Sequence, residues 1–156
     1  MLFRSVPGEA GEPDAETLAQ VSALVPPRFQ GYVPARHPAL RYGIALNDRG
    51  YFWESQEILE TVWAAAPQGG RERILLRACI QVANANLKLR TQKPRAAARH
   101  FGEALAEVEP LLARTATGRG GFADSFPLPA LAAHLKAKLA QPSLSKADWI
   151  ALGAKI

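Results

Sequence analysis

The residues best suited to chemistry lie in one stretch, from Gly50 to Trp63, which holds three glutamates, one glutamine and four aromatic side chains within fourteen positions. If this stretch is a helix, Glu57 and Glu60 are three residues apart and Gln56 and Glu60 four, so these side chains converge. Two converging carboxylates repel each other, which raises the pKa of one of them or recruits a cation. Either outcome would serve proton transfer or metal binding.

At about 100° per residue, the stretch has two adjacent sides. The first is predicted to be plain core and comprises Phe52, Ser55, Ile58, Leu59, Val62 and Ala66. The second is a polar stripe with a tryptophan at each end: Trp53, Gln56, Glu57, Glu60 and Trp63, with Glu54 nearly opposite its centre. A simpler alternative is that the glutamates are solvated and pair with arginines of a neighbouring helix.

Three amides, Gln81, Asn84 and Asn86, interrupt the apolar pattern of the segment 71–90. Amides are poor helix formers and are costly to bury without partners, so their presence predicts something for them to bond. If this segment packs against the stripe, the candidate ligand site comprises Trp53, Glu54, Gln56, Glu57, Glu60, Trp63, Gln81 and Asn84. Glu57 and Glu60 are its candidates for a divalent cation. The alternative is a buried polar network that fixes the register of the helices.

The elements that must position these residues are predicted to be helical, because no segment alternates with period two and apolar residues recur at helical spacing. Proline at first turns and glycine after last turns mark the ends. We expect an all-α antiparallel bundle of two helical hairpins plus a C-terminal helix, with an extended Pro-rich N-terminal arm. The domains are the arm with one short helix, 1–36, and the bundle, 37–156. Helices are expected near 14–25, 38–47, 51–66, 71–90, 94–114 and 129–139, a loop at 115–125, and a capping box at Ser145 and Asp148.

Composition limits the class of protein. The chain has 156 residues, 48% of them hydrophobic, which fits one globular unit with a sizeable core. Its net charge is +5, but the nineteen Lys and Arg are spread along the chain, which favours solvated helix faces and makes a nucleic-acid partner unlikely. The single Cys79 is expected to be buried and the protein cytoplasmic. We expect no signal peptide and no membrane partner, since no run of about 18 apolar residues occurs.

Three segments resemble the domain-of-unknown-function family 309 of bacteria and archaea: residues 41–47, 50–63 and 80–83, with a similar Pro-rich lead-in at 26–38. The resemblance implies a small helical bundle of unknown activity, with a His-x-x-x-Glu-x-x-Trp pattern suggested to bind metal. Glu54, Glu57, Glu60 and Trp63 match that core, whereas Gln56 replaces the histidine. A glutamine carbonyl is a weak, hard donor, so we expect a family-like zinc or iron site to be weakened or lost. His37, His100 and His134 are expected to be surface or packing residues.

Three functions are compatible with these residues. The leading hypothesis is a non-enzymatic or degenerate-enzyme helical bundle that binds a small polar or cationic ligand at the groove lined by Glu, Gln and Trp. The second is a hydrolase-like enzyme in which carboxylates hold a divalent cation that activates water. The third is an interaction module similar to tetratricopeptide repeats, because paired hairpins occur there too. No other cofactor is predicted, and a homo-oligomer stays open.

Overall fold

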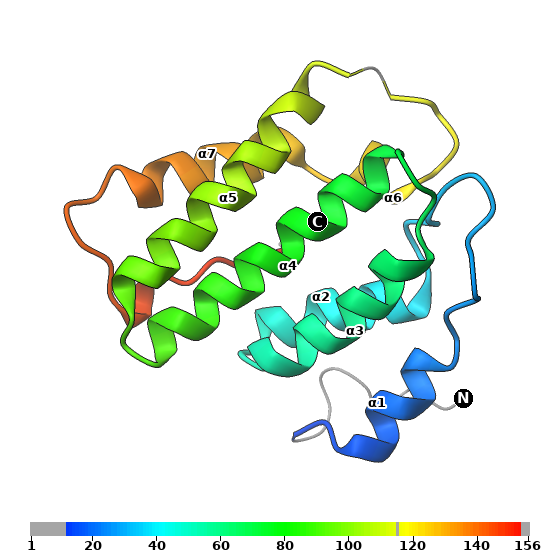
Figure 1. The fold of residues 1–156 in the computed structure, drawn as a ribbon, viewed down its shortest axis with the longest axis horizontal. Coiled ribbons are helices and arrows are strands. Elements are labelled where there is room, and N and C mark those ends of the chain that lie inside the picture. The colour runs from blue at the N-terminus through cyan, green and yellow to red at the C-terminus, as the bar shows by residue number, and fades with distance from the viewer. Residues whose placement is uncertain (1–11, 115, 154–156) are drawn as a thin grey trace.

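The described residues fold into α-helices that are joined by tight turns and by longer loops (Figure 1). The computed structural model describes residues 12–114 and 116–153, so the start of the predicted arm, residues 1–11, lies outside it. The helices are α1 (Ala15–Ser22), α2 (Pro38–Asp48), α3 (Phe52–Ala65), α4 (Arg71–Arg90), α5 (Pro94–Leu112), α6 (Phe122–Ser125) and α7 (Leu128–Leu139), followed by the 3-10 turn η2 (Lys146–Asp148). The predicted all-α fold is confirmed. Within the described residues, no helix is both long and apolar enough to cross a bilayer.

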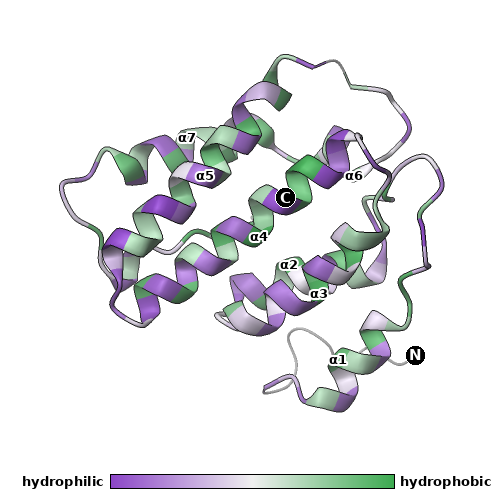
Figure 2. Ribbon diagram, in the orientation of Figure 1, coloured by the Kyte–Doolittle hydropathy of each residue, from purple (hydrophilic) through white to green (hydrophobic). Residues whose placement is uncertain are grey.

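From α1 to α5, each helix packs beside the next one in the chain (Figure 1). The hairpin of α2 and α3 packs beside the hairpin of α4 and α5 through α3 and α4, while α7 covers α5 and α1 lies against α2 and α3. Figure 2 shows hydrophilic and hydrophobic residues alternating along α4 and α5, as expected for helices that bury one side. Cys79 lies in the core, as predicted, and its burial raises the pKa of the thiol.

Caps and turn residues explain where the helices begin and end. His37 caps α2, because its Nδ1 accepts the backbone N–H of Ala39 at 3.1 Å. Gly50, with a φ of +92°, supplies the left-handed residue that turns the chain from α2 into α3. The predicted capping box is also present, with Asp148 Oδ2 accepting the N–H of Ser145 at 2.7 Å. These local signals therefore fix the ends of several helices.

The segment between α1 and α2 crosses the body as a strap, which we define as residues 28–37. Its Phe29 N–H donates to the carbonyl of Ala65 at 2.8 Å, and its Val33 carbonyl accepts the N–H of Phe122 at 2.8 Å. Phe29 and Val33 anchor the strap, because both are buried, whereas Tyr32 is only half-buried. The strap thereby joins α3 to the segment that contains α6.

The segment 115–125 was expected to be a loop, and its last four residues instead form α6. Phe122 and Phe126 explain the difference, because both are buried and their rings meet edge to face with centroids 5.3 Å apart. Burial of two aromatic side chains stabilises this short turn, which has too few residues to be a stable helix alone.

Close packing of α2 on α3 depends on Gly43. A Cβ at this buried position would lie 2.7 Å from Leu59 Cδ2 and 3.2 Å from Ile58 Cγ2. We therefore expect Gly43→Ala to lower the free energy of unfolding by about 1–2 kcal/mol, because overpacking outweighs the gain in helix propensity. Urea unfolding measures this difference.

Gly102 on α5 provides the matched control, since a Cβ there would meet nothing within 4 Å. Gly102→Ala should raise the free energy of unfolding by about 0.5–1 kcal/mol through helix propensity alone. Equal stabilisation by both substitutions would show that the close approach of α2 and α3 does not require glycine.

Candidate functional site

The helix α3 turns the predicted polar stripe away from the core. Its opposite side, with Phe52, Ile58 and Leu59, is buried, and the Ser55 hydroxyl donates to the carbonyl of Gly43 at 2.7 Å. This hydrogen bond to α2 fixes the rotation of α3 about its axis. As a result, one face of α3 is committed to the core and the stripe lies on its accessible side.

Glu57 and Glu60 face α1, which had been placed in the predicted arm. Both are exposed and line a shallow groove of about 690 Å³ between α1 and α3. The remaining walls are mostly small or apolar: Ala15, Leu18, Ala19, Ser22, Ile58, Thr61 and Ala64. Two carboxylates therefore lie one turn apart at the edge of this groove and give that edge a negative charge.

The other residues of the stripe have separate surroundings. Trp53, four residues before Glu57, is 60% exposed. Gln56 is half-buried, and its Nε2 makes a long hydrogen bond of 3.4 Å to the Phe52 carbonyl. Glu54 belongs to the surroundings of Tyr42 on α2: burial raises the pKa of Tyr42, and the charges of nearby carboxylates including Glu54 raise it further. Of these residues, only Trp53 presents a large open surface.

Trp63 is covered by arginines of α4. The guanidinium carbon of Arg73 lies 4.0 Å from the centre of the Trp63 ring, and that of Arg77 lies 5.5 Å away. Arg73 also donates to the carbonyls of Trp63 and Ala66 at 3.2 and 3.0 Å, which satisfies the C-terminal end of α3. Trp63 therefore joins α3 to α4 by cation–π contacts and is less available to a ligand than Trp53.

Gln81 and Asn84 contact α5, not the stripe on α3. Gln81 Oε1 lies 2.8 Å from His100 Nδ1, and Asn84 Nδ2 lies 3.3 Å from His100 Nε2. Partial burial lowers the pKa of His100, an effect that the carboxylate of Glu103 opposes. A neutral imidazole with its proton on Nδ1 satisfies both amides at once. The structure thus brings these two amides together with His100 and leaves Glu57 and Glu60 beside α1.

Few of the side chains that could bind a metal ion lie close to one another. Across residues 12–114 and 116–153, no group of three or more His, Cys, Asp or Glu side chains is arranged to hold a metal ion. His37 is occupied as the cap of α2, and His134 is exposed on α7. Glu57 and Glu60 are left as a two-carboxylate pair, which suits an organic cation better than a divalent metal that needs about six oxygen ligands.

A buried polar cluster joins α2 and α4 to the segment after η2. Asn86 Nδ2 donates to Asn47 Oδ1 and to the carbonyl of Ile150, both at 2.8 Å, and Asn86 Oδ1 accepts the Ile150 N–H at 2.9 Å. Asp48 accepts the N–H groups of Leu152 and Gly153, both at 2.6 Å. The sequence predicted that Asn86 needs partners, and the structure gives it Asn47 and the backbone of Ile150.

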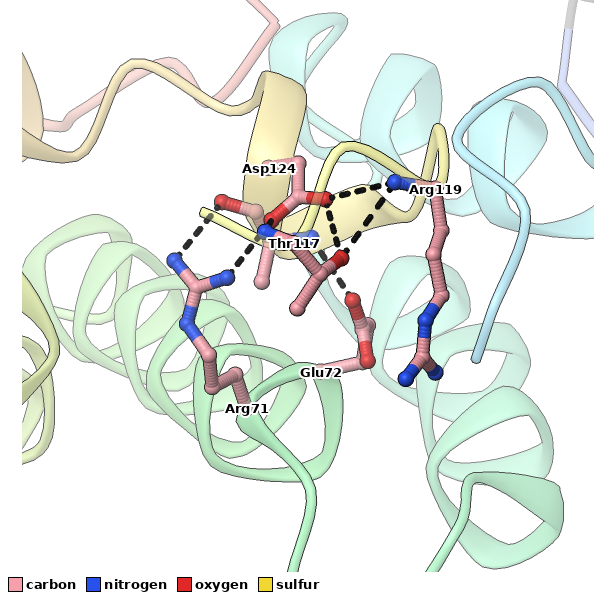
Figure 3. A network of polar contacts seen from close by, with 6 residues as sticks. Arg71, Glu72, Thr117, Arg119 and Asp124 are labelled. Atoms are coloured by element: carbon pink, nitrogen blue, oxygen red, sulfur yellow. Dashed lines mark hydrogen bonds and ion pairs between the residues drawn. The ribbon is translucent and has the colours of Figure 1, made fainter. Parts of the chain in front are cut away.

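A second polar cluster holds the segment 116–125 and left no sequence signal (Figure 3). Arg71 forms an ion pair of 2.6 Å with Asp124, whose side chain is 9% exposed. The buried Glu72 accepts the N–H of Ala123 at 3.2 Å. Hydrogen bonds, first among them the one from the hydroxyl of Thr117, hold the pKa of Asp124 well below its usual range. Most polar groups of the two clusters bond to one another, although the buried Nε of Arg71 has no hydrogen-bond partner among the described residues. Both clusters therefore serve to hold the fold together.

One comparison with known proteins agrees with the resemblance seen in the sequence. Residues 40–100 match the model of a family described as Domain of unknown function (DUF309). No curated protein and no solved structure matches the chain. The match spans α2, α3, α4 and the start of α5, which include the groove carboxylates and the amides around His100. Over residues 40–100, the chain is therefore similar to the DUF309 family.

Proposed function

We propose that this protein binds a small organic cation in the groove between α1 and α3, with Glu57 and Glu60 holding the positive charge. The supporting observation is that both carboxylates are exposed in the groove and neither forms an ion pair with any described Lys, Arg or His. Lys and Arg outnumber Asp and Glu by 19 to 14, so internal cations are plentiful. Glu57 and Glu60 are therefore available to a cation from outside the protein.

The walls of the groove define the rest of the ligand. Leu18, Ala19 and Ala64 offer apolar surface, and the Thr61 hydroxyl already donates to the Glu57 carbonyl at 3.2 Å. The groove therefore favours an ammonium group on an apolar body, such as an alkylammonium ion. Trp53 lies on the same side of α3 and presents an aromatic face of the kind that attracts cations.

This binding role has more support than the two alternatives. A metal-dependent hydrolase would need further ligands beside the two carboxylates, and the described residues supply no such cluster. An interaction module would be favoured by one continuous apolar surface. The exposed large hydrophobic side chains instead come from five segments of the described chain: Leu24, Trp53, Leu112, Leu139 and Trp149.

Calorimetric titration with hexylammonium tests the proposal, with hexan-1-ol as the neutral probe of the same length. We expect hexylammonium to bind, hexanol to bind far more weakly, and the affinity to fall as salt rises, because exposed charges are screened. The double substitution Glu57→Gln with Glu60→Gln should weaken hexylammonium binding by at least about tenfold through loss of both charges.

A matched control removes the same charge elsewhere. Glu103→Gln with Glu109→Gln alters two exposed acids of α5 and should leave hexylammonium binding unchanged. Substitution at Glu57 and Glu60 should also change the free energy of unfolding by no more than about 0.5 kcal/mol, as expected for exposed side chains. Unchanged binding in the Glu57/Glu60 variant would refute the proposal, and a stability loss of several kcal/mol would show that the pair is structural.

A further inference from the structure

A larger cavity, of about 820 Å³, lies along α2. Four segments enclose it: the strap, one face of α2, the segment around α6, and residues 151–153 after η2. Its apolar walls include Ile44, Phe122, Phe126 and Leu152. The volume falls within the range of roughly 300–1,000 Å³ that is typical of sites for small molecules.

The charged groups of this cavity favour an anion. Asp48 is the only acidic residue among those lining it, and both of its oxygens already accept the backbone N–H groups of Leu152 and Gly153. Arg36 and Arg41 also line the cavity and are exposed, and neither forms an ion pair within the described part of the chain. Two exposed arginines without an ion pair among the described residues therefore line the cavity together with one carboxylate whose oxygens are already hydrogen-bonded.

Hydrogen bonds within the protein hold the walls of this cavity in position. Residues after η2 are fixed by Asp48 and by the two hydrogen bonds between Asn86 and the backbone of Ile150. The segment around α6 is fixed by Glu72, which accepts the Ala123 N–H, and by the hydrogen bond from Phe122 to the strap. Because the walls of the cavity are already positioned, ligand binding loses less conformational entropy of the protein.

We propose that this cavity binds a small amphipathic carboxylate. Its apolar chain or ring would lie against Ile44, Phe126 and Leu152, and its carboxylate would pair with Arg36 and Arg41. Arginine suits this role, because its planar guanidinium matches a carboxylate with two parallel hydrogen bonds. The charge preference is opposite to that of the groove between α1 and α3, so this site is independent of the proposed cation site.

Titration with octanoate, followed by calorimetry and by backbone amide NMR, tests the proposal. We expect octanoate to bind, and octan-1-ol and octylammonium to bind at least about tenfold more weakly, because they cannot pair with the arginines. The largest chemical-shift changes should fall on the lining residues Gly120, Ser125 and Gly153. Equal binding of octanol, or shift changes confined to α1 and α3, would overturn the assignment.

Substitutions locate the two halves of the ligand. Arg36→Gln with Arg41→Gln should weaken octanoate binding by at least about tenfold, whereas Arg28→Gln with Arg95→Gln, which removes two exposed arginines outside the cavity, should not. Ala45→Leu, which adds bulk to the cavity wall on α2, should also weaken octanoate binding while thermal unfolding stays cooperative. Full affinity in either the Arg36/Arg41 or the Ala45 variant would contradict the proposed site.

Discussion

Replacing Asn86 with alanine should lower the free energy of unfolding by about 3–4 kcal/mol, the largest effect expected of a single substitution here. Asn86 is fully buried and makes three hydrogen bonds, to Asn47 Oδ1 and to both backbone groups of Ile150. Alanine would leave the Ile150 N–H and an Asn47 acceptor buried without partners, at about 1–3 kcal/mol each, and would open a small cavity. Urea unfolding followed by circular dichroism measures the loss.

Asn84→Ala is the matched control, because it changes the same residue type two positions away on α4. Asn84 is only half-buried and makes a single contact of 3.3 Å with His100, so we expect a loss of about 1 kcal/mol or less. Asn86→Asp should be nearly as damaging as Asn86→Ala, because a carboxylate would face two acceptor oxygens. Similar losses at Asn84 and Asn86 would show that the cluster with Ile150 contributes little.

Removing the carboxylate of Asp124 should cost about 2–3 kcal/mol and loosen residues 116–121. Oδ1 accepts from Arg71 at 2.6 Å and from the Thr117 N–H at 3.1 Å, and Oδ2 accepts from the Thr117 hydroxyl at 2.6 Å and the Arg119 N–H at 3.3 Å. Asp124→Ala breaks all four contacts and leaves the Arg71 guanidinium, whose side chain is 10% exposed, without its anion. Trypsin should then cleave faster after Arg119, and urea unfolding should report the stability loss.

The same carboxylate gives stability a defined dependence on pH. The pKa of Asp124 is lower in the folded protein than in the unfolded chain, so the unfolded state binds its proton first as pH falls. The stabilisation from Asp124 is therefore complete above about pH 5 and is lost progressively as pH falls through 4 toward the folded pKa. Asp124→Ala should flatten this acid limb. Ser125→Ala, at the exposed neighbouring residue, should leave it unchanged, and an unaltered acid limb in the Asp124 variant would contradict this account.

The sequence predicted the elements of the fold better than the partners of the polar residues. The ends of the long helices are set by local signals such as Pro38, Gly50 and Pro94, and their length by the 3.6-residue repeat of apolar residues. The long helices therefore lie close to their predicted bounds. Periodicity also identified the buried side of α3. It could not say which helix covers the other side, and for this reason Glu57 and Glu60 were expected beside α4 and lie beside α1.

Residues that act across long sequence separations were the least predictable. Asn86 is 64 residues from Ile150, and Asp124 is 53 residues from Arg71, so neither pairing leaves a local pattern. The cavity lined by Arg36 and Arg41 is enclosed by four segments and has no motif. Gln81 and Asn84 were correctly singled out as amides that need partners, but the sequence placed those partners on α3 and not at His100 on α5.

The cluster around Asn86 also has a consequence for the order of folding. Asn47 and Asn86 belong to helices that are synthesised well before Ile150, so during synthesis their amides must wait for the last part of the network. Closing contacts of such long sequence separation costs loop entropy, so we expect this cluster to form after the helices have packed. The contacts of the segment after η2 are therefore expected to change the rate of folding little. They should stabilise the native state chiefly by slowing its unfolding.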